Sequence, residues 1–175
     1  LMRAESPGPS VGKLVPKIKH TARILYIIYL GLSLIEFVVL IAAKMPVFDA
    51  MNTTFGTAGT GGFGIKNSSL GGYSVTIQWI VTIFMMLFGV NFNAYYIMIF
   101  GSIKKALSME EVRAYFGIIL TAIVIITINI YSICSGVWDA VTKSAFQVGS
   151  IITTTGFATT DFNIWPQTSK TILVL

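Results

Sequence analysis

Two short segments rich in glycine and threonine carry the clearest chemistry in this sequence. Residues 57–64 follow Val-Phe-Asp-Ala at 47–50, residues 153–157 follow Val-Trp-Asp-Ala at 137–140, and both segments contain Gly-Phe. Glycine tolerates the backbone angles that turn successive carbonyl oxygens toward one axis, where they can replace the hydration shell of an ion. Threonine hydroxyls can add ligands or brace the loop. The repeated pattern therefore predicts ion binding by backbone oxygen atoms.

The order of helix and loop indicates the sign of the ion. A short helix is expected before each glycine loop, so the negative end of its dipole points at the loop. Phosphate-binding loops have the opposite order, with the glycines before the helix. We therefore expect a cation, and the order argues against a nucleotide site at Gly-Thr-Gly-Gly 59–62.

The composition predicts that these loops are held in a membrane. The chain is 54% hydrophobic and only 11% charged, whereas about a quarter of the residues of a soluble domain are charged. Residues 24–43 contain one charge, Glu36, and residues 70–102 and 114–138 contain none. Each stretch supplies the roughly 20 apolar residues needed to cross a hydrocarbon core. Non-helical backbone between such spans is tolerated where it is buried in protein or lines a water-filled cavity.

The net charge of +5 is placed unevenly and predicts the orientation. Eight basic residues precede the first span or separate the second from the third, which makes those connections cytoplasmic and brings both glycine loops in from outside. No aromatic or arginine-rich patch accompanies them, so nucleic acid is not an expected partner. The basic residues are Arg3, Lys13, Lys17, Lys19, Arg23, Lys104, Lys105 and Arg113.

The predicted fold is an all-α membrane protein made of tandem helix–pore-loop–helix repeats. From the aspartate to the glycine before phenylalanine there are 13 residues in the first copy and 17 in the second, so the second pore helix is expected to be one turn longer. The expected layout is a basic cytoplasmic connector with an interfacial helix at 1–23, a repeat at 24–107 (helix 24–43, pore helix 47–57, filter 58–64, helix 72–102), and a repeat at 108–175 (helix 110–135, pore helix 138–151, filter 153–158, start of a last helix 167–175).

Here the residues resemble a family. Phe-Asp-Ala 48–50 with Gly-Gly-Phe 61–63, and the run Thr-Thr-Thr-Gly-Phe-Ala-Thr-Thr-Asp-Phe at 153–162, resemble the second and third pore segments of TrkH-type potassium uptake proteins of the Trk/Ktr/HKT superfamily. The resemblance covers nearly the whole chain, including Arg-Ile-Leu-Tyr 23–26 and Gly-Val-Asn-Phe 89–92. The chain starts without Met and stops in an apolar stretch, and we expect it to be a fragment of a longer protein.

The resemblance implies a four-repeat, potassium-channel-like pore in which this chain supplies repeats two and three. It implies K⁺ as the permeating ion, no covalent cofactor, a multi-pass protein of the bacterial inner membrane, a homodimer, and a cytosolic nucleotide-binding regulatory subunit of TrkA type with RCK domains. Repeats one and four and the intramembrane gating loop would lie elsewhere. By matching motifs, the backbone ligands of K⁺ are Thr60, Gly61, Gly62, Thr154, Thr155 and Gly156, and the supporting residues are Gly59, Phe63, Thr153 and Phe157.

Several other residues have expected roles. Phe63 and Phe157 are expected to pack outward against the pore helices, and Asp49 and Asp139 are expected to cap those helices or to attract cations. Glu36 in the first span is expected to make a structural contact with another helix, with a repeat or subunit contact and ion coordination as alternatives. Ser-x-x-Glu at 108–111 predicts a capping box for the third span.

Two further function classes remain open from the residues alone. A non-transporting membrane subunit could scaffold a complex through its glycine-rich loops, and its ion flux would then not depend on them. A membrane enzyme could use the loop for a phosphate, which the order of helix and loop disfavours. No catalytic constellation stands out, because the one histidine, His20, lies in the basic connector, where neither a metal site nor a catalytic triad can be assembled around it.

Overall fold

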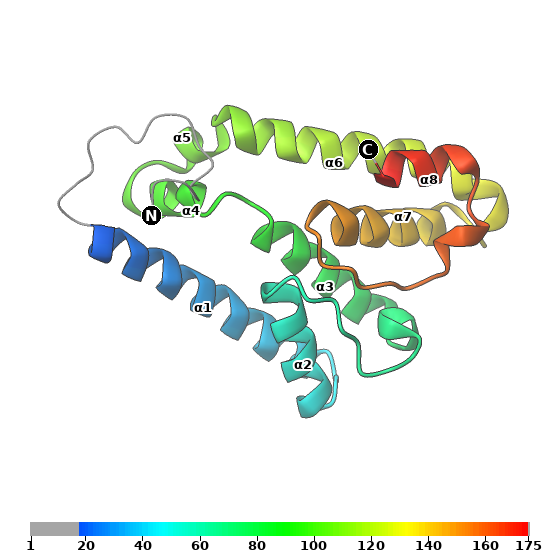
Figure 1. Cartoon of the computed structure of the whole chain (residues 1–175), viewed down its shortest axis with the longest axis horizontal. Helices are drawn as coiled ribbons and strands as arrows, with labels where there is room; N and C mark the ends of the chain where they lie inside the picture. The colour runs from blue at the N-terminus through cyan, green and yellow to red at the C-terminus, as the bar shows by residue number, and fades with distance from the viewer. Residues whose placement is uncertain (1–17, 175) are drawn as a thin grey trace.

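The computed structural model describes residues 18–174, and these residues form helices joined by loops, with no strand among them (Figure 1). The predicted all-α fold is therefore confirmed for this part of the chain. Residues 1–17 of the predicted basic connector lie outside the described residues. The helices are α1 (Ile18–Ala42), α2 (Val47–Ala58), α3 (Val75–Phe88), α4 (Phe92–Phe100), α5 (Ile103–Leu107), α6 (Glu110–Ile130), α7 (Val137–Ile152) and α8 (Gln167–Val174), with 3-10 turns at Ser69–Gly72, Tyr131–Ile133 and Phe162–Ile164.

Two helices are long and apolar enough to cross a membrane. They are Thr21–Ala42 in α1 and Glu110–Ile133, which begins with α6, and the bent pair α3–α4 counts as a third if it is one span. Large apolar side chains of α1 and α6 point away from the protein; Leu34 and Leu120 are 62% and 64% exposed. Water would penalise such surfaces, whereas lipid would not. These residues therefore form the surface of a membrane protein.

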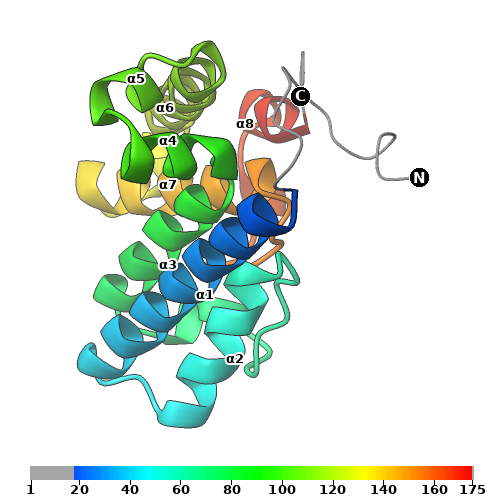
Figure 2. The same cartoon turned by 90° about the vertical axis from the view of Figure 1, so that its left-hand side faces the viewer.

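The helices are arranged around α3. It contacts α1 and α2 on one side and α7 on the other, and α7 in turn packs against α6 and α8. Figure 2 shows α1 running across α3 with α2 beside both. The short helix of each repeat is thus held against longer helices, and its following loop is held with it.

The two short helices differ in length as the sequence predicts. Helix α2 has 12 residues and α7 has 16, a difference of four residues or about one turn. Their N-caps are Pro46 and Gly136, and neither cap makes a side-chain hydrogen bond. The prediction that Asp49 and Asp139 are N-caps is therefore wrong, because each lies in the first turn, two residues after the first helical position.

The predicted continuous helix over 72–102 is broken. Helix α3 ends at Phe88, α4 begins at Phe92, and the two helices bend by 85°. Gly89 ends the first helix, and the Asn91 side chain accepts the amide hydrogen of Asn93 at the start of the second. Such a break frees carbonyl groups that need other donors. The bend divides the predicted helix 72–102 into two shorter helices.

Tyrosine hydroxyls supply donors at the break. Tyr95 donates to the Leu87 carbonyl at 2.7 Å, and Tyr115 of α6 donates to the Met86 carbonyl at 3.0 Å. The predicted capping box is wrong, because the N-cap of α6 is Met109 and makes no side-chain bond. The Glu111 carboxylate instead accepts a hydrogen bond from the Asn91 side chain at 2.7 Å. The break is therefore tied to α6 at two points.

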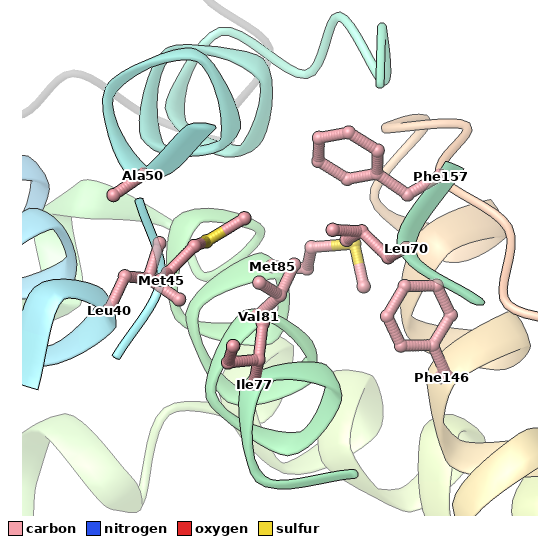
Figure 3. Packing of buried hydrophobic residues seen from close by; sticks show 9 residues of the cluster. All are labelled: Leu40, Met45, Ala50, Leu70, Ile77, Val81, Met85, Phe146 and Phe157. Carbon is pink, nitrogen blue, oxygen red and sulfur yellow. The ribbon is translucent and has the colours of Figure 1, made fainter. Parts of the chain in front are cut away.

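A core beneath the short helices joins the two repeats. Nine buried residues from α1, α2, α3, α7 and three connecting segments pack together, and Figure 3 shows Phe157 reaching from the loop after α7 toward α2, with Leu70 beside it. Burying apolar side chains between protein elements fixes the loops relative to one another. The nine residues are Leu40, Met45, Ala50, Leu70, Ile77, Val81, Met85, Phe146 and Phe157.

The close packing at the break gives a test of the fold. A Cβ at Gly89 would overlap the Tyr115 hydroxyl and lie 2.8 Å from the Thr153 Cγ2 atom, whereas a Cβ at Gly117 in α6 would meet nothing within 4 Å. We expect Gly89→Ala to lower the free energy of unfolding by about 1–3 kcal/mol, because overpacking forces neighbours to move. Gly117→Ala is the matched control. Thermal unfolding of the purified intact protein measures both, and equal midpoints would contradict this packing.

Candidate ion-binding loops

The first loop folds back on the C-terminal end of α2. Four consecutive backbone amides, from Gly59 to Gly62, donate to carbonyls of the last turns of that helix. The helix therefore satisfies the donors of its own loop, and its free carbonyls are satisfied in return. The bonds are Gly59 N–H to Phe55 O (2.9 Å), Thr60 N–H to Thr57 O (3.2 Å), Gly61 N–H to Gly56 O (2.8 Å) and Gly62 N–H to Gly56 O (3.4 Å).

The second loop makes the same four bonds at the end of α7. When the two loops are aligned on the glycine before phenylalanine, Gly59 matches Thr153 and Gly62 matches Gly156. In both loops one carbonyl accepts hydrogen bonds from two amides. That carbonyl belongs to Gly56 in the first copy and to Ser150 in the second. The bonds are Thr153 N–H to Gly149 O (3.3 Å), Thr154 N–H to Ile151 O (2.9 Å), Thr155 N–H to Ser150 O (2.9 Å) and Gly156 N–H to Ser150 O (3.3 Å).

Both loops use left-handed backbone at matching positions. Thr60 and Thr154 have φ of 49° and 57°, and Gly62 and Gly156 have φ of 64° and 89°. Positive φ is rare for a β-branched residue and costs energy, and such strain concentrates at functional sites. Gly61 and Thr155 between them have negative φ. Alternating handedness turns successive amides to one side of the chain, so the carbonyl oxygens face the other side.

The carbonyl oxygens of these residues have no partners in the described part of the chain. No hydrogen bond there ends on the backbone oxygens of Thr60, Gly61, Gly62, Thr154, Thr155 or Gly156. Thr60, Gly61, Thr154 and Gly156 are exposed, so water or a cation can satisfy their carbonyls in place of a protein donor. These six oxygens are therefore available to a ligand that accepts electron pairs.

The two loops touch each other. A Cβ at Gly62 would overlap the Thr155 carbonyl oxygen and lie 2.8 Å from the Gly156 carbonyl carbon, so only glycine fits there. A Cβ at Gly156 would meet nothing within 4 Å. Gly62 and Gly156 therefore lie near each other, and among the described residues neither carbonyl accepts a hydrogen bond.

Threonine hydroxyls brace the second loop. The Thr153 hydroxyl donates to the Gly149 carbonyl at 2.7 Å, and its oxygen lies 2.7 Å from the Thr155 hydroxyl. Because Thr153 has only one hydrogen to give, Thr155 is the donor of the second bond. Both threonines are buried, while Thr154 is exposed. Bracing is therefore the role that the structure gives to two of the three threonine hydroxyls.

The two phenylalanines behave differently. Phe157 is 1% exposed and its ring lies against Gly56 of α2, where a Cβ would come within 2.8 Å of the ring. Phe63 is 86% exposed, so the expectation that it packs on a pore helix is wrong within this chain. The difference arises because the loop of the second repeat has the first repeat as a neighbour, whereas the matching side of the first loop is uncovered among the described residues.

Asp49 and Asp139 lie in the first turns of the short helices α2 and α7. Asp49 accepts a hydrogen bond of 2.6 Å from the Tyr73 hydroxyl, and the Lys66 ammonium lies 3.8 Å from the centre of the Tyr73 ring. Asp139 pairs with Lys143 at 2.8 Å and accepts the Ser135 amide hydrogen at 3.2 Å. Each aspartate therefore ties the start of its helix to neighbouring chain.

Glu36 of α1 is buried beside the end of α2. Its carboxyl is fully buried between helices, with Thr57 of α2 as its nearest hydroxyl partner and no hydrogen bond satisfying either oxygen. Helix α1 contacts both α2 and α3. Its position fits the expected structural contact between helices.

Sequence reasoning did not single out Gly56 and Ser150, the residues whose carbonyls each hold two loop amides. The available signal is their spacing, since each lies six residues before the loop glycine. It also did not single out Ser69 and Leu70, whose contacts with Ala158 join residues 89 and 88 positions apart. No local pattern could indicate that contact.

The family model for TrkH, described as a cation transport protein, matches residues 1–175 of the sequence. The chain belongs to the TrkH family. The Trk system potassium uptake protein TrkH of Salmonella typhimurium is 36% identical over 171 residues, which cover 95% of this chain and 35% of that protein. The Trk system potassium uptake protein TrkG of Escherichia coli is 31% identical over 181 residues, covering 100% of this chain and 37% of that protein.

The fold of this TrkH-family chain matches a solved structure. The crystal structure of the potassium transporter TrkH from Vibrio parahaemolyticus aligns with a TM-score of 0.84 and 30% sequence identity, over 94% of this chain and 36% of that one. The chain thus spans about a third of the length of the relatives it matches. The resemblance inferred from the two glycine loops is confirmed.

Alkaline pH tests the anchor of α2 in this TrkH-family chain. Burial, and then the hydrogen bond to Asp49, raise the pKa of Tyr73 from its ordinary value of 10 to about 12. Because the folded state holds the proton more tightly, the stabilisation is complete below about pH 10 and is lost as the pH rises toward 12. We expect Tyr73→Phe to remove this part of the alkaline loss of stability.

Unfolding midpoints of the intact protein, measured between pH 8 and 12, provide the readout. Tyr26→Phe on the lipid-facing side of α1, where the ring is 62% exposed, is the control. If both variants lose stability with pH as the unmodified protein does, Tyr73 does not anchor the helix.

Proposed function

We propose that this chain forms part of a K⁺-selective permeation path in a Trk-type potassium uptake protein. K⁺ would shed water at the two loops and bind the backbone oxygens of Thr60, Gly61, Gly62, Thr154, Thr155 and Gly156, which take the place of its hydration shell. Gly59, Thr153 and Phe157 would support those residues. The ion is cargo, and no covalent cofactor takes part.

One observation carries this proposal. Two loops far apart in the sequence make the same four hydrogen bonds, share alternating backbone handedness, and leave their carbonyl oxygens unbonded where they meet. The negative ends of two helix dipoles also point at this place, which favours a cation over an anion. The names of the relatives, potassium uptake proteins of the Trk system, support K⁺ as that cation.

The assembly follows from the same reasoning. Two loops enclose only part of an ion path, so we infer that two further repeats complete a four-repeat pore in the intact protein. Relatives about three times as long support this. We also propose a multi-pass protein of the bacterial inner membrane that forms a homodimer and is regulated by a cytosolic TrkA-type subunit with RCK domains. The name "Trk system", which indicates several components, supports such a subunit.

Serine substitutions at the two glycines test the function. We expect Gly62→Ser and Gly156→Ser to lower the permeability ratio of K⁺ to Na⁺ in the intact protein. The loss should reach about tenfold at Gly62, equivalent to about 1.4 kcal/mol, because a side chain there overlaps the second loop. It should be smaller at Gly156, where space is open and only the positive φ resists a side chain.

Flux of K⁺ and Na⁺ into proteoliposomes measures the ratio. Gly136→Ser is the matched control, because Gly136 begins α7 in extended backbone with open space around it. Unchanged ratios at both loop glycines would contradict the proposal. Loop variants that prevent assembly while leaving ion flux intact would favour the scaffold subunit instead.

A further inference from the structure

The segment that follows the second loop is held by the first repeat. The Leu70 amide donates to the Ala158 carbonyl at 3.0 Å, and the Ala158 amide donates to the Ser69 hydroxyl oxygen at 3.2 Å. Both groups of Ala158 are thus bonded to residues that lie after the first loop. Nearby, a Cβ at Gly71 would come within 2.7 Å of the Thr159 carbonyl oxygen, so the two backbones are in close contact.

Ser69 adopts an unfavourable conformation to make this bond. Its φ is 50°, a left-handed value that costs a non-glycine residue energy and persists only where the surroundings impose it. The adjacent Ser68 has an ordinary φ of −80° and makes no bond to the second loop. The hydrogen bond from the Ala158 amide to the Ser69 hydroxyl gives a reason for this unfavourable φ.

A second contact holds the same segment from the other side. The Phe157 ring lies on Gly56 of α2, and the Phe157 carbonyl accepts a bond of 2.6 Å from the Ser150 hydroxyl. Gly56 is also the residue whose carbonyl receives the amides of Gly61 and Gly62. Gly56 of α2 therefore holds the first loop, because its carbonyl accepts two of the loop amides. It also leaves room for the Phe157 ring of the second loop, because it has no side chain.

We infer that Ser69, Leu70 and Gly56 form a clamp on Phe157 and Ala158 that sets the positions of the carbonyls of Thr154, Thr155 and Gly156. Ser69 and Gly56 are then positioning residues for ion selection, although neither supplies a ligand. This inference rests on the proposed function. It goes beyond it by assigning part of the selectivity of the second loop to residues of the first repeat.

The physical reason is that selection between cations depends on how oxygens are held. A ring of carbonyls that can move adapts to ions of several sizes, whereas a fixed ring favours one. The residues that carry ligands must therefore be held by a supporting set with locked geometry. The second loop is bonded to α7 through its amides, and the clamp adds the restraint immediately after Gly156.

Removing the Ser69 hydroxyl tests the clamp without adding strain. Glycine accepts a φ of 50°, so Ser69→Gly in the intact protein should fold with an unmoved unfolding midpoint while the Ala158 amide loses its partner. We expect the K⁺ to Na⁺ permeability ratio to fall by about 2- to 10-fold, the effect of one hydrogen bond. Ser69→Asn should restore the ratio, because asparagine tolerates left-handed backbone and offers a carbonyl oxygen. Ser68→Gly is the matched control.

If Ser69→Gly does not fold, a second pair of variants tests whether residues of the first repeat position the second loop. Gly56→Ala should push the Phe157 ring away and lower the ratio, because its Cβ would lie 2.8 Å from the ring. Adding Phe157→Leu removes the clashing atoms, so the double variant should recover part of the ratio that Gly56→Ala loses. A ratio that is unaffected by Gly56→Ala would overturn the role of Gly56.

The unmodified protein separates failure of the clamp from failure of the function. If it conducts K⁺ selectively and the ratio is the same in Ser69→Gly, Ser68→Gly and Gly56→Ala, the clamp is overturned and the function stands. If the unmodified protein conducts no K⁺, the proposed function is overturned and the clamp with it. A selective fall in Ser69→Gly with rescue by Ser69→Asn supports both.

Discussion

In this TrkH-family chain, the last carbonyls of each short helix accept hydrogen bonds from the amides of the loop that follows it. The rest of the structure depends on this constraint. Four amides turn back onto the last carbonyls of α2 or α7. The loop carbonyls cannot then bond within the loop, because the amides that would serve them are already used. The left-handed threonine and glycine in each loop are the cost of this arrangement. A cation is the ligand that suits several unbonded oxygens beside two negative helix ends.

The surrounding helices bring the two loops to the same place. Helix α3 of the first repeat lies between α1 and α2 on one side and α7 on the other, and the core beneath the loops contains residues of both repeats. The contacts between the repeats are directional. The second loop places Phe157 against α2 and the Thr155–Gly156 peptide against Gly62, whereas Phe63 and the Cα of Gly156 face open space. Within the described part of the chain, Phe157 and Gly62 are therefore covered by the other repeat, whereas Phe63 and Gly156 are not.

Much of the site could be predicted from the sequence because its signals are local. The glycine before phenylalanine, the preceding threonine and the four-residue difference between the helices all follow from residue type and spacing. The bend at Gly89 was not predicted, because a stretch of apolar residues reads the same whether the helix is straight or broken. The carbonyls at the bend are bonded by the hydroxyls of Tyr95 and Tyr115, which are not adjacent to them in the sequence.

Asp49, Asp139 and Ser108 are residue types that cap helices, but the helices begin at other residues. Asp139 bonds residues of its own neighbourhood, Ser135 and Lys143, whereas other errors involve distant partners. Asp49 bonds Tyr73, 24 residues away, and Glu111 bonds Asn91, 20 residues away. The contact between Ser69 and Ala158 is of the same kind. Tertiary contacts outweigh local preference here.

Anomalous diffraction from crystals of the intact protein soaked in Rb⁺ tests the central claim most directly, because Rb⁺ resembles K⁺ and its position can be seen. The account predicts a peak bounded by the backbone oxygens of the two loops, at coordination distance from those of residues 60–62 and 154–156. A peak elsewhere, or loop carbonyls turned away from an empty centre in a Rb⁺-soaked crystal, would contradict it.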